Sequence, residues 1–146
     1  MSSVETLYEK ASPKARAIVE EILTADADDQ AWLEQLGPAL TGATVARMLG
    51  VSPQAVSTNK GLLRLKMRSG RVGYPIFQFK GRSPIPGLGA IVRQLEPVVA
   101  TEWTTASWLT TPNSELDGDT PVEALRLDKL DAAMRAAQRF ATALAN

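Results

Sequence analysis

The chain has 146 residues, which is enough for one compact domain or for two small modules that share a core. It contains neither Cys nor His, which excludes disulfides, Cys/His zinc sites and acid/base chemistry by imidazole. No nucleophile motif is recognisable either, so we expect that the protein is not an enzyme and needs no cofactor. The charges of the 16 basic and 16 acidic side chains cancel. However, the stretch between Glu34 and Glu96 contains nine basic residues and no acidic one. Such segregation of charge is typical of a protein that binds a polyanion.

Two acidic helices are predicted at the N-terminus. The first covers residues 12–25, where Ser12 is placed as the N-cap, Pro13 occupies the first helical position and apolar residues follow at helical spacing. The second is short, covers residues 25–37 and ends at Gly37. Because both helices are acidic on their exposed sides, we expect them to face away from any phosphate backbone.

A helix-turn-helix is predicted over residues 41–61. Apolar residues give the first helix one buried face, and Gly50 follows where the chain must turn sharply. Ser52 and Pro53 begin a second helix, which ends at Gly61. A solvated helix in an unrelated helical domain is the alternative. If the motif binds DNA, base-edge or phosphate contacts are expected from Ser52, Gln54, Ser57, Thr58 and Lys60.

A basic hairpin is predicted after Gly61, because the period of the pattern changes from 3.6 to 2. Its strands cover residues 62–68 and 74–80. The second strand has Phe77 and Phe79 on one side and is confined to an edge by Pro75. Together with the preceding helices this gives a winged helix-turn-helix with a basic wing. We expect four basic side chains of the hairpin to contact phosphates: Arg64, Lys66, Arg68 and Arg71. The alternative is that they lie on an ordinary charged edge strand.

The C-terminal part is predicted to be helical and begins after a Pro/Gly-rich linker at residues 81–89. One helix is interrupted near Pro97, and another contains Trp103 and Trp108, which we interpret as core residues. After a loop, Thr120 and Glu123 form a capping box that begins the last helical region. This region carries an apolar stripe made of Leu127, Leu130, Met134, Ala137, Ala141 and Leu144. The stripe either closes the core of the C-terminal part or packs against the same stripe of a second copy in a two-fold dimer.

Residues 108–125, WLTTPNSELDGDTPVEAL, carry a family resemblance. A Trp-Leu pair, a Pro-Asn loop, a Leu-x-Gly turn and a Pro-led helix follow one another, at Trp108, Leu109, Pro112, Asn113, Leu116, Gly118, Pro121 and Leu125. This run resembles the toxin-binding domain of the Xre/MbcA/ParS antitoxin family. The resemblance implies a DNA-binding antitoxin that neutralises a toxin, usually of the NAD-consuming RES class. The toxin-binding residues it implies are Trp108, Pro112, Asn113, Leu116 and Gly118, together with Asn146 in a tail that covers the active site of the toxin.

The sequence therefore predicts a mostly α protein with a winged helix-turn-helix in residues 1–82 and a helical toxin-binding or dimerisation domain in residues 83–146. The expected function is that of an antitoxin that blocks a RES-type toxin sterically and, as a homodimer, represses its own operon at a palindromic operator. The alternative is a free-standing winged helix-turn-helix transcription regulator of phage or plasmid type. With no apolar run of membrane-spanning length and no secretory signal, we expect a cytoplasmic protein without membrane contacts.

Overall fold

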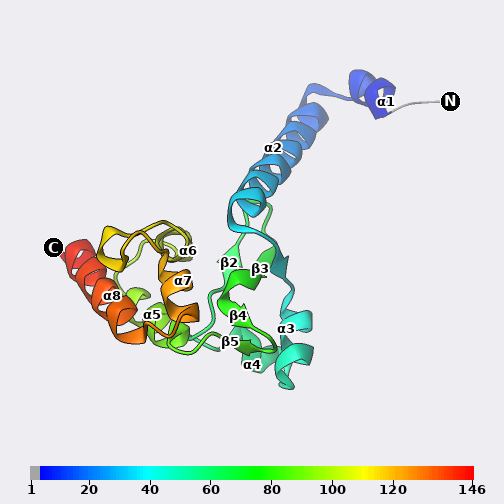
Figure 1. The fold of residues 1–146 in the computed structure, drawn as a ribbon. Coiled ribbons are helices and arrows are strands. Elements are labelled where there is room, and N and C mark those ends of the chain that lie inside the picture. Colours follow the sequence, from blue (N-terminus) through cyan, green and yellow to red (C-terminus); the bar gives the residue numbers. More distant parts are fainter. Residues whose placement is uncertain (1–3) are drawn as a thin grey trace.

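A helical arm forms the N-terminal end of the chain and projects from the rest of the molecule (Figure 1). The computed structural model describes residues 4–146 and begins with α1 (Val4–Lys10), for which no helix was predicted, and α2 (Pro13–Leu36). Because α2 is one continuous helix of 24 residues, the prediction of two helices meeting near residue 25 is wrong. The sequence within α2 contains no Gly and no Pro after Pro13, so nothing in it interrupts the helix before Gly37, where φ is 89°.

Two short helices and two small sheets make up the middle of the chain. α3 and α4 are joined by a tight turn in which Gly50 has a φ of 69°, and β3 is the central strand of an antiparallel sheet with the order β1-β3-β2. A separate antiparallel hairpin is formed by β4 and β5. The bounds are β1 (Ala39–Leu40), α3 (Gly42–Leu49), α4 (Pro53–Ser57), β2 (Leu65–Lys66), β3 (Val72–Pro75), β4 (Phe79–Lys80) and β5 (Ser83–Pro84).

The basic hairpin differs from the prediction in its second strand. Side chains at residues 63–68 do alternate between buried and exposed, as predicted. The predicted strand over residues 74–80 is wrong, because a 3-10 turn (Ile76–Gln78) separates β3 from β4. Pro75 lies in the central strand rather than at an edge, and it is tolerated there as the last residue of β3. The turn also sends Phe77 and Phe79 into two different hydrophobic clusters instead of onto one face.

The C-terminal part consists of α5 (Leu88–Leu95), α6 (Glu102–Leu109), α7 (Pro121–Arg126) and α8 (Leu130–Ala145), with a 3-10 turn (Ser114–Leu116) between α6 and α7. The capping box is confirmed: Thr120 Oγ1 accepts from the backbone N–H of Glu123 at 3.1 Å, and the Glu123 carboxylate accepts from the N–H of Thr120 at 3.0 Å. α5 ends immediately before Glu96 and Pro97, which agrees with the predicted interruption.

α8 closes the core of the C-terminal part through half of the predicted stripe: Ala137 is buried, and Met134 and Ala141 pack against the same cluster. Asp128, with a φ of 60°, separates α7 from α8, and the other members of the stripe, Leu127, Leu130 and Leu144, are exposed. The fully buried side chains of α8 are small and allow close packing, namely Ala133, Ala136 and Ala137. No helix within residues 4–146 is both long enough and apolar enough to cross a membrane.

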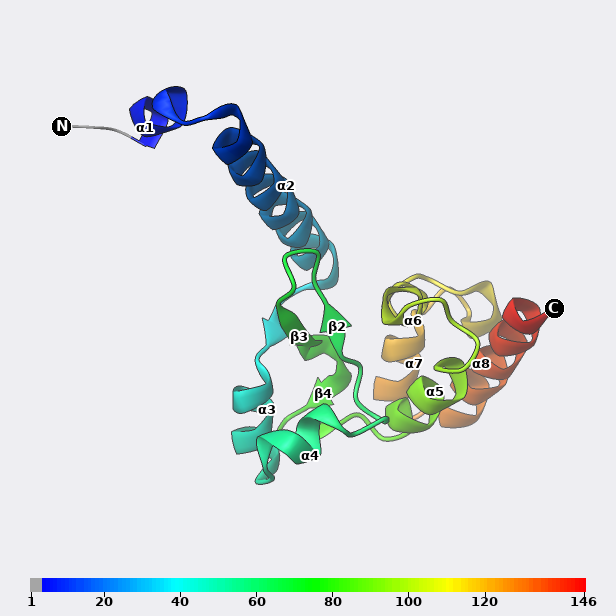
Figure 2. The same cartoon turned by 180° about the vertical axis from the view of Figure 1, so that it is seen from behind.

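The N-terminal and C-terminal parts share one hydrophobic core. Leu36, Leu63 and Leu65 belong to the same buried cluster as residues of α5 to α8, so the core extends across the boundary expected near residue 82. Two side chains also bridge the parts. Trp103 Nε1 donates to the Lys66 carbonyl at 3.0 Å, and Arg126 donates to two backbone carbonyls of residues 77–79 at 2.9 Å each. Figure 2 shows the two parts side by side from behind.

Candidate nucleic-acid interface

α4 is held in place by its own sequence and by α3. The Ser52 hydroxyl accepts from the backbone N–H of Ala55 at 3.1 Å, and Pro53 begins the helix. Val56, which is 1% exposed, packs in a buried cluster with Val45 of α3. The opposite side of α4 therefore faces outward. α4 is shorter than predicted, because Thr58 ends it and donates its hydroxyl to the Gln54 carbonyl at 2.8 Å.

The residues predicted on this helix are all exposed: Ser52, Gln54, Ser57, Thr58 and Lys60. The Ser52 hydroxyl serves as the cap, and the Ser57 hydroxyl donates to the Gln54 carbonyl at 3.1 Å. The amide of Gln54 remains outside the helix as a donor and acceptor. Lys60 Nζ lies 3.7 Å from a Glu96 carboxylate oxygen, but both side chains are at least half exposed, so this ion pair holds the lysine only weakly.

Three further basic side chains lie near α4 and were not among the predicted site residues. The β4–β5 hairpin packs toward α4, since Phe79 shares a cluster with Val56, and its Lys80 and Arg82 are exposed. Arg93 of α5 lies against the segment that follows α4, because a Cβ at Gly61 would be only 3.1 Å from Arg93 Cζ. All three belong to the acid-free stretch of the sequence, which was the one signal that could have identified them. We use the term α4 face for Gln54, Lys60, Lys80, Arg82 and Arg93.

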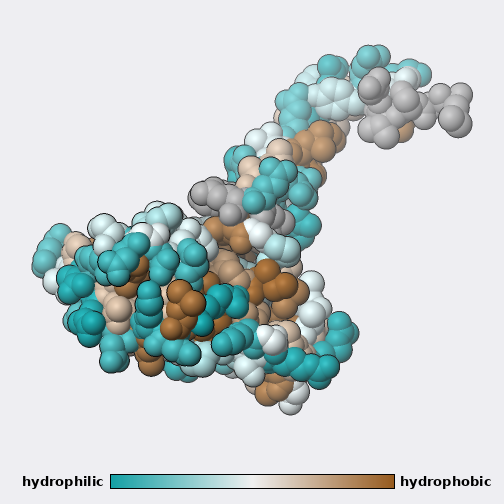
Figure 3. All heavy atoms as spheres, viewed as in Figure 1, coloured by the Kyte–Doolittle hydropathy of each residue, from teal (hydrophilic) through white to brown (hydrophobic). Residues whose placement is uncertain are grey.

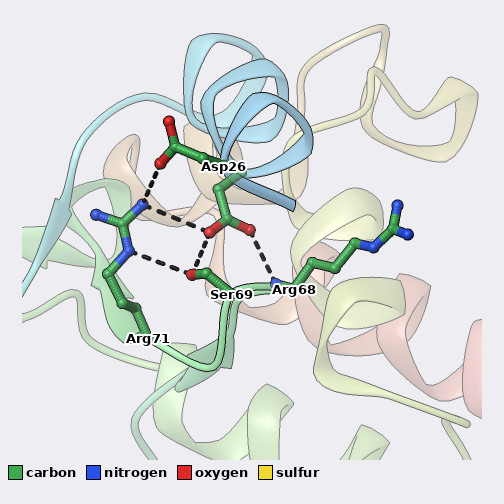
Figure 4. Close-up of polar contacts among 5 residues, drawn as sticks. Asp26, Arg68, Ser69 and Arg71 are labelled. Atoms are coloured by element: carbon green, nitrogen blue, oxygen red, sulfur yellow. Dashed lines mark hydrogen bonds and ion pairs between the residues drawn. The ribbon is translucent and has the colours of Figure 1, made fainter. Parts of the chain in front are cut away.

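The turn of the β2–β3 hairpin lies at the end of α2, away from α4 (Figure 1). Its Arg71 is paired with Asp26 of α2 (Figure 4). Asp29 is 2% exposed and accepts from the Arg68 backbone N–H at 2.8 Å and from the Ser69 hydroxyl at 2.5 Å. Arg71 Nη2 lies 3.2 Å from an Asp26 oxygen and 3.5 Å from an Asp29 oxygen. The Arg68 guanidinium is ion-paired with Asp28. The acidic end of α2 therefore places a carboxylate beside each of the two arginines that were expected to contact DNA.

The remaining basic residues predicted on the hairpin are Arg64 and Lys66, and both are exposed. Lys66 lines a shallow pocket together with Asp28 and Asp29, so it lies on the α2 side with Arg68. The fold thus separates the predicted basic residues. Lys60 lies next to α4, whereas Lys66, Arg68 and Arg71 lie beside aspartates of α2.

Burial of Asp29 would by itself raise its pKa, but hydrogen bonds from Ser69, Arg68 and Arg71 outweigh burial and hold the pKa of this carboxyl below its ordinary value. A lowered pKa in the folded state means that the ionised carboxylate stabilises the fold above about pH 4 and that this contribution is lost as the pH falls through the lowered pKa. Acid should therefore loosen the contact between α2 and the hairpin.

We expect Asp29→Asn to lower the free energy of unfolding by about 1 to 3 kcal/mol at pH 7, because the amide nitrogen cannot accept the bonds that the carboxylate accepts. The loss should shrink as the pH falls through the lowered pKa of Asp29, because the wild-type carboxyl then also becomes protonated. Urea denaturation over a series of pH values from 7 downward measures this. Asp28→Asn, which removes a half-exposed partner of Arg68, is the control and should change stability much less. Equal losses in the two variants would contradict the role given to Asp29.

The residues that the resemblance implied for toxin binding mainly shape a turn. Asn113 accepts from the Glu115 backbone N–H at 2.8 Å, Leu116 is buried, and Gly118 has a φ of 89°. Pro112 and Asn146 are exposed. Trp108 is half-buried and stacks on Phe140, with ring centroids 5.4 Å apart and planes 11° from parallel. These two rings line a groove together with Trp103, Thr104, Ser107 and Thr111.

No family model matches the chain, and no curated protein matches it. Among solved structures, the NMR structure of Rv2175c is similar, with a TM-score of 0.60 and 25% sequence identity. The similarity covers 71% of this chain and 81% of that chain. A TM-score of this size over most of both chains indicates a shared fold.

The α4 face has the chemistry of a surface that contacts a polyanion. It presents an exposed amide and four cations from three separate segments, and the acidic residue paired with it, Glu96, lies at the edge of the acid-free stretch. Within residues 4–146 no group of three or more Asp or Glu side chains is placed to hold a metal ion.

Proposed function

We propose that the protein is a DNA-binding transcription regulator in which α3 and α4 form a helix-turn-helix and α4 enters the major groove. The observation that carries this proposal is the α4 face, where an exposed short helix carries an outward amide and the segments next to it carry exposed cations. In a helix-turn-helix the second helix reads base edges, and flanking basic residues bind phosphates. The likeness to Rv2175c supports the fold on which this proposal rests.

The β4–β5 hairpin is the wing in this proposal. Its buried Phe79 fixes it to the cluster that also holds α4, and its Lys80 and Arg82 are exposed. The β2–β3 turn suits the role less well, because phosphate contact by Arg68 and Arg71 would first require their ion pairs with the aspartates of α2 to break. Gln54 is assigned to a base edge, for which its amide can both donate and accept.

The experiment that tests the proposal is binding of the full-length chain to a fluorescein-labelled duplex, followed by fluorescence anisotropy over a series of salt concentrations. Phosphate contacts release counterions, so log K should fall linearly with log salt concentration, by about 0.9 for each phosphate contact. Failure to bind duplex DNA at low salt would overturn the proposal.

Neutralisation of a toxin is a second candidate function, favoured by the groove that Trp108 and Phe140 line on the C-terminal part. Half-buried aromatic rings are frequent anchors for protein partners. If this candidate is right, the chain should co-purify with the product of a neighbouring toxin gene, and Trp108→Ala should abolish the complex without affecting DNA binding. If the two proteins form no complex when they are co-expressed, DNA-binding regulation would remain as the one proposed function.

A further inference from the structure

Large apolar side chains lie uncovered on the N-terminal arm. Ile18 is 51% exposed, Ile22 and Leu23 are each 62% exposed, and Leu7 of α1 is 60% exposed. The arm stands away from the rest of the described chain in Figure 1, and hydrophobic side chains are visible along it in Figure 3. An amphipathic helix whose apolar side has no neighbour is typical of an interaction surface.

These side chains form one continuous surface. Ala15, Ile18 and Ile22 follow one another at spacings of three and four along α2, so they lie on one face. α1 widens this surface, since Leu7 and Ala11 line a groove with Val19 and Leu23 of α2. A hydrogen bond from the Tyr8 hydroxyl to the Glu20 carboxylate holds α1 in that position. The arm therefore offers an apolar stripe together with a groove beside it.

The charges along the stripe are ordered in a way that suits a second copy of the same arm. On the edge of the stripe beside Ile18, Lys14 precedes Glu21 by two helical turns, so both side chains lie on the same side of α2. This edge is therefore basic toward the N-terminus of α2 and acidic further along. In an antiparallel pair related by a two-fold axis near Ile18, Lys14 of each copy would meet Glu21 of the other copy. A parallel pair would instead place Lys14 level with Lys14 and Glu21 level with Glu21.

We propose that the arm is a homodimer interface on which a second copy of this chain docks antiparallel, with Ile18 at its centre and Ile22 further along the same buried face. The inference does not depend on DNA binding. It places the two-fold axis on α2 and not on α8, whose small-residue face is already buried in the core of its own chain. Because the arms project from the body, the two DNA-binding parts of such a dimer would lie at opposite ends of the paired helices.

The test is the mass of the full-length chain in solution, measured by light scattering after size exclusion and by sedimentation equilibrium. The wild type should have twice the chain mass of 15.7 kDa. Ile18→Glu combined with Ile22→Glu should raise the dimer Kd by more than about a hundredfold, because each of these side chains loses its burial in both copies. Leu127→Glu is the matched control, since Leu127 is 61% exposed outside the arm, and this variant should remain dimeric. A monomeric wild type, or a double variant that still dimerises, would overturn the proposal.

Charge reversal tests the orientation with variants that leave the apolar stripe intact. Lys14→Glu alone and Glu21→Lys alone should each weaken the dimer, because each places like charges across the interface. The double variant should recover the wild-type Kd to within a few-fold, since both interfacial pairs are then restored in reverse. Circular dichroism should show the same helix content in all three variants. A double variant weaker than either single variant would rule out the antiparallel pairing.

Discussion

Replacement of Lys80 and Arg82 by alanine is expected to weaken binding to duplex DNA of any sequence and to flatten its salt dependence. In our proposal both side chains contact phosphates from the β4–β5 hairpin, and both are exposed in the structure. Removal of each phosphate contact should reduce the slope of log K against log salt concentration by about 0.9. The measurement is anisotropy of a labelled duplex with wild-type and variant protein over the same salt series.

The matched control for this variant is Arg68→Ala combined with Arg71→Ala, which removes the same amount of charge from the β2–β3 hairpin. Because both arginines are paired with aspartates of α2, their removal should leave the salt slope nearly unchanged. It should instead lower the free energy of unfolding, since Asp29 is deprived of one of its donors and stays buried. A flatter slope for this control and an unchanged slope for the β4–β5 variant would show that phosphates contact the β2–β3 hairpin.

Replacement of Gln78 by leucine is expected to destabilise the protein more than Asp29→Asn does. Gln78 is 0% exposed, and its Oε1 accepts from the Leu63 backbone N–H at 2.8 Å. Its Nε2 donates to the carbonyls of Leu63 and Pro75 at 2.9 and 3.1 Å. The side chain thus takes the place of a neighbouring strand for Leu63. Leucine has a similar size but would leave these buried backbone groups without partners, at a cost of about 3 kcal/mol or more.

Urea denaturation of the full-length chain measures the effect of Gln78→Leu, and the melting temperature should fall by roughly 10 °C. Gln138→Leu is the control because Gln138 is exposed on α8 and its side-chain oxygen accepts a single hydrogen bond, from Gln94. This control should change the free energy of unfolding by well under about 1 kcal/mol. Similar losses in the two variants would contradict the role assigned to Gln78.

The sequence by itself determined the features that depend on near neighbours in the chain. The left-handed turn at Gly50, the cap at Ser52 and the capping box of Thr120 and Glu123 were all predicted and are all present. Each involves residues no more than a turn or two apart, so composition and spacing suffice to predict it. The mostly helical class follows from the same local signals. The acid-free stretch likewise identified which part of the chain carries the positive charge.

Only the tertiary structure decided which of those positive charges remain available. The ion pairs of Arg68 and Arg71 with the aspartates of α2 join residues about forty positions apart, and no local pattern indicates that they meet. The hydrogen bonds of Gln78 to Leu63 and the packing of Leu63 and Leu65 with α5 to α8 are also long-range. Such contacts depend on which distant segments of the chain pack together, and the local pattern of charge and hydrophobicity does not specify this. The sequence therefore located a basic segment, whereas the fold divided it into a paired hairpin and an exposed α4 face.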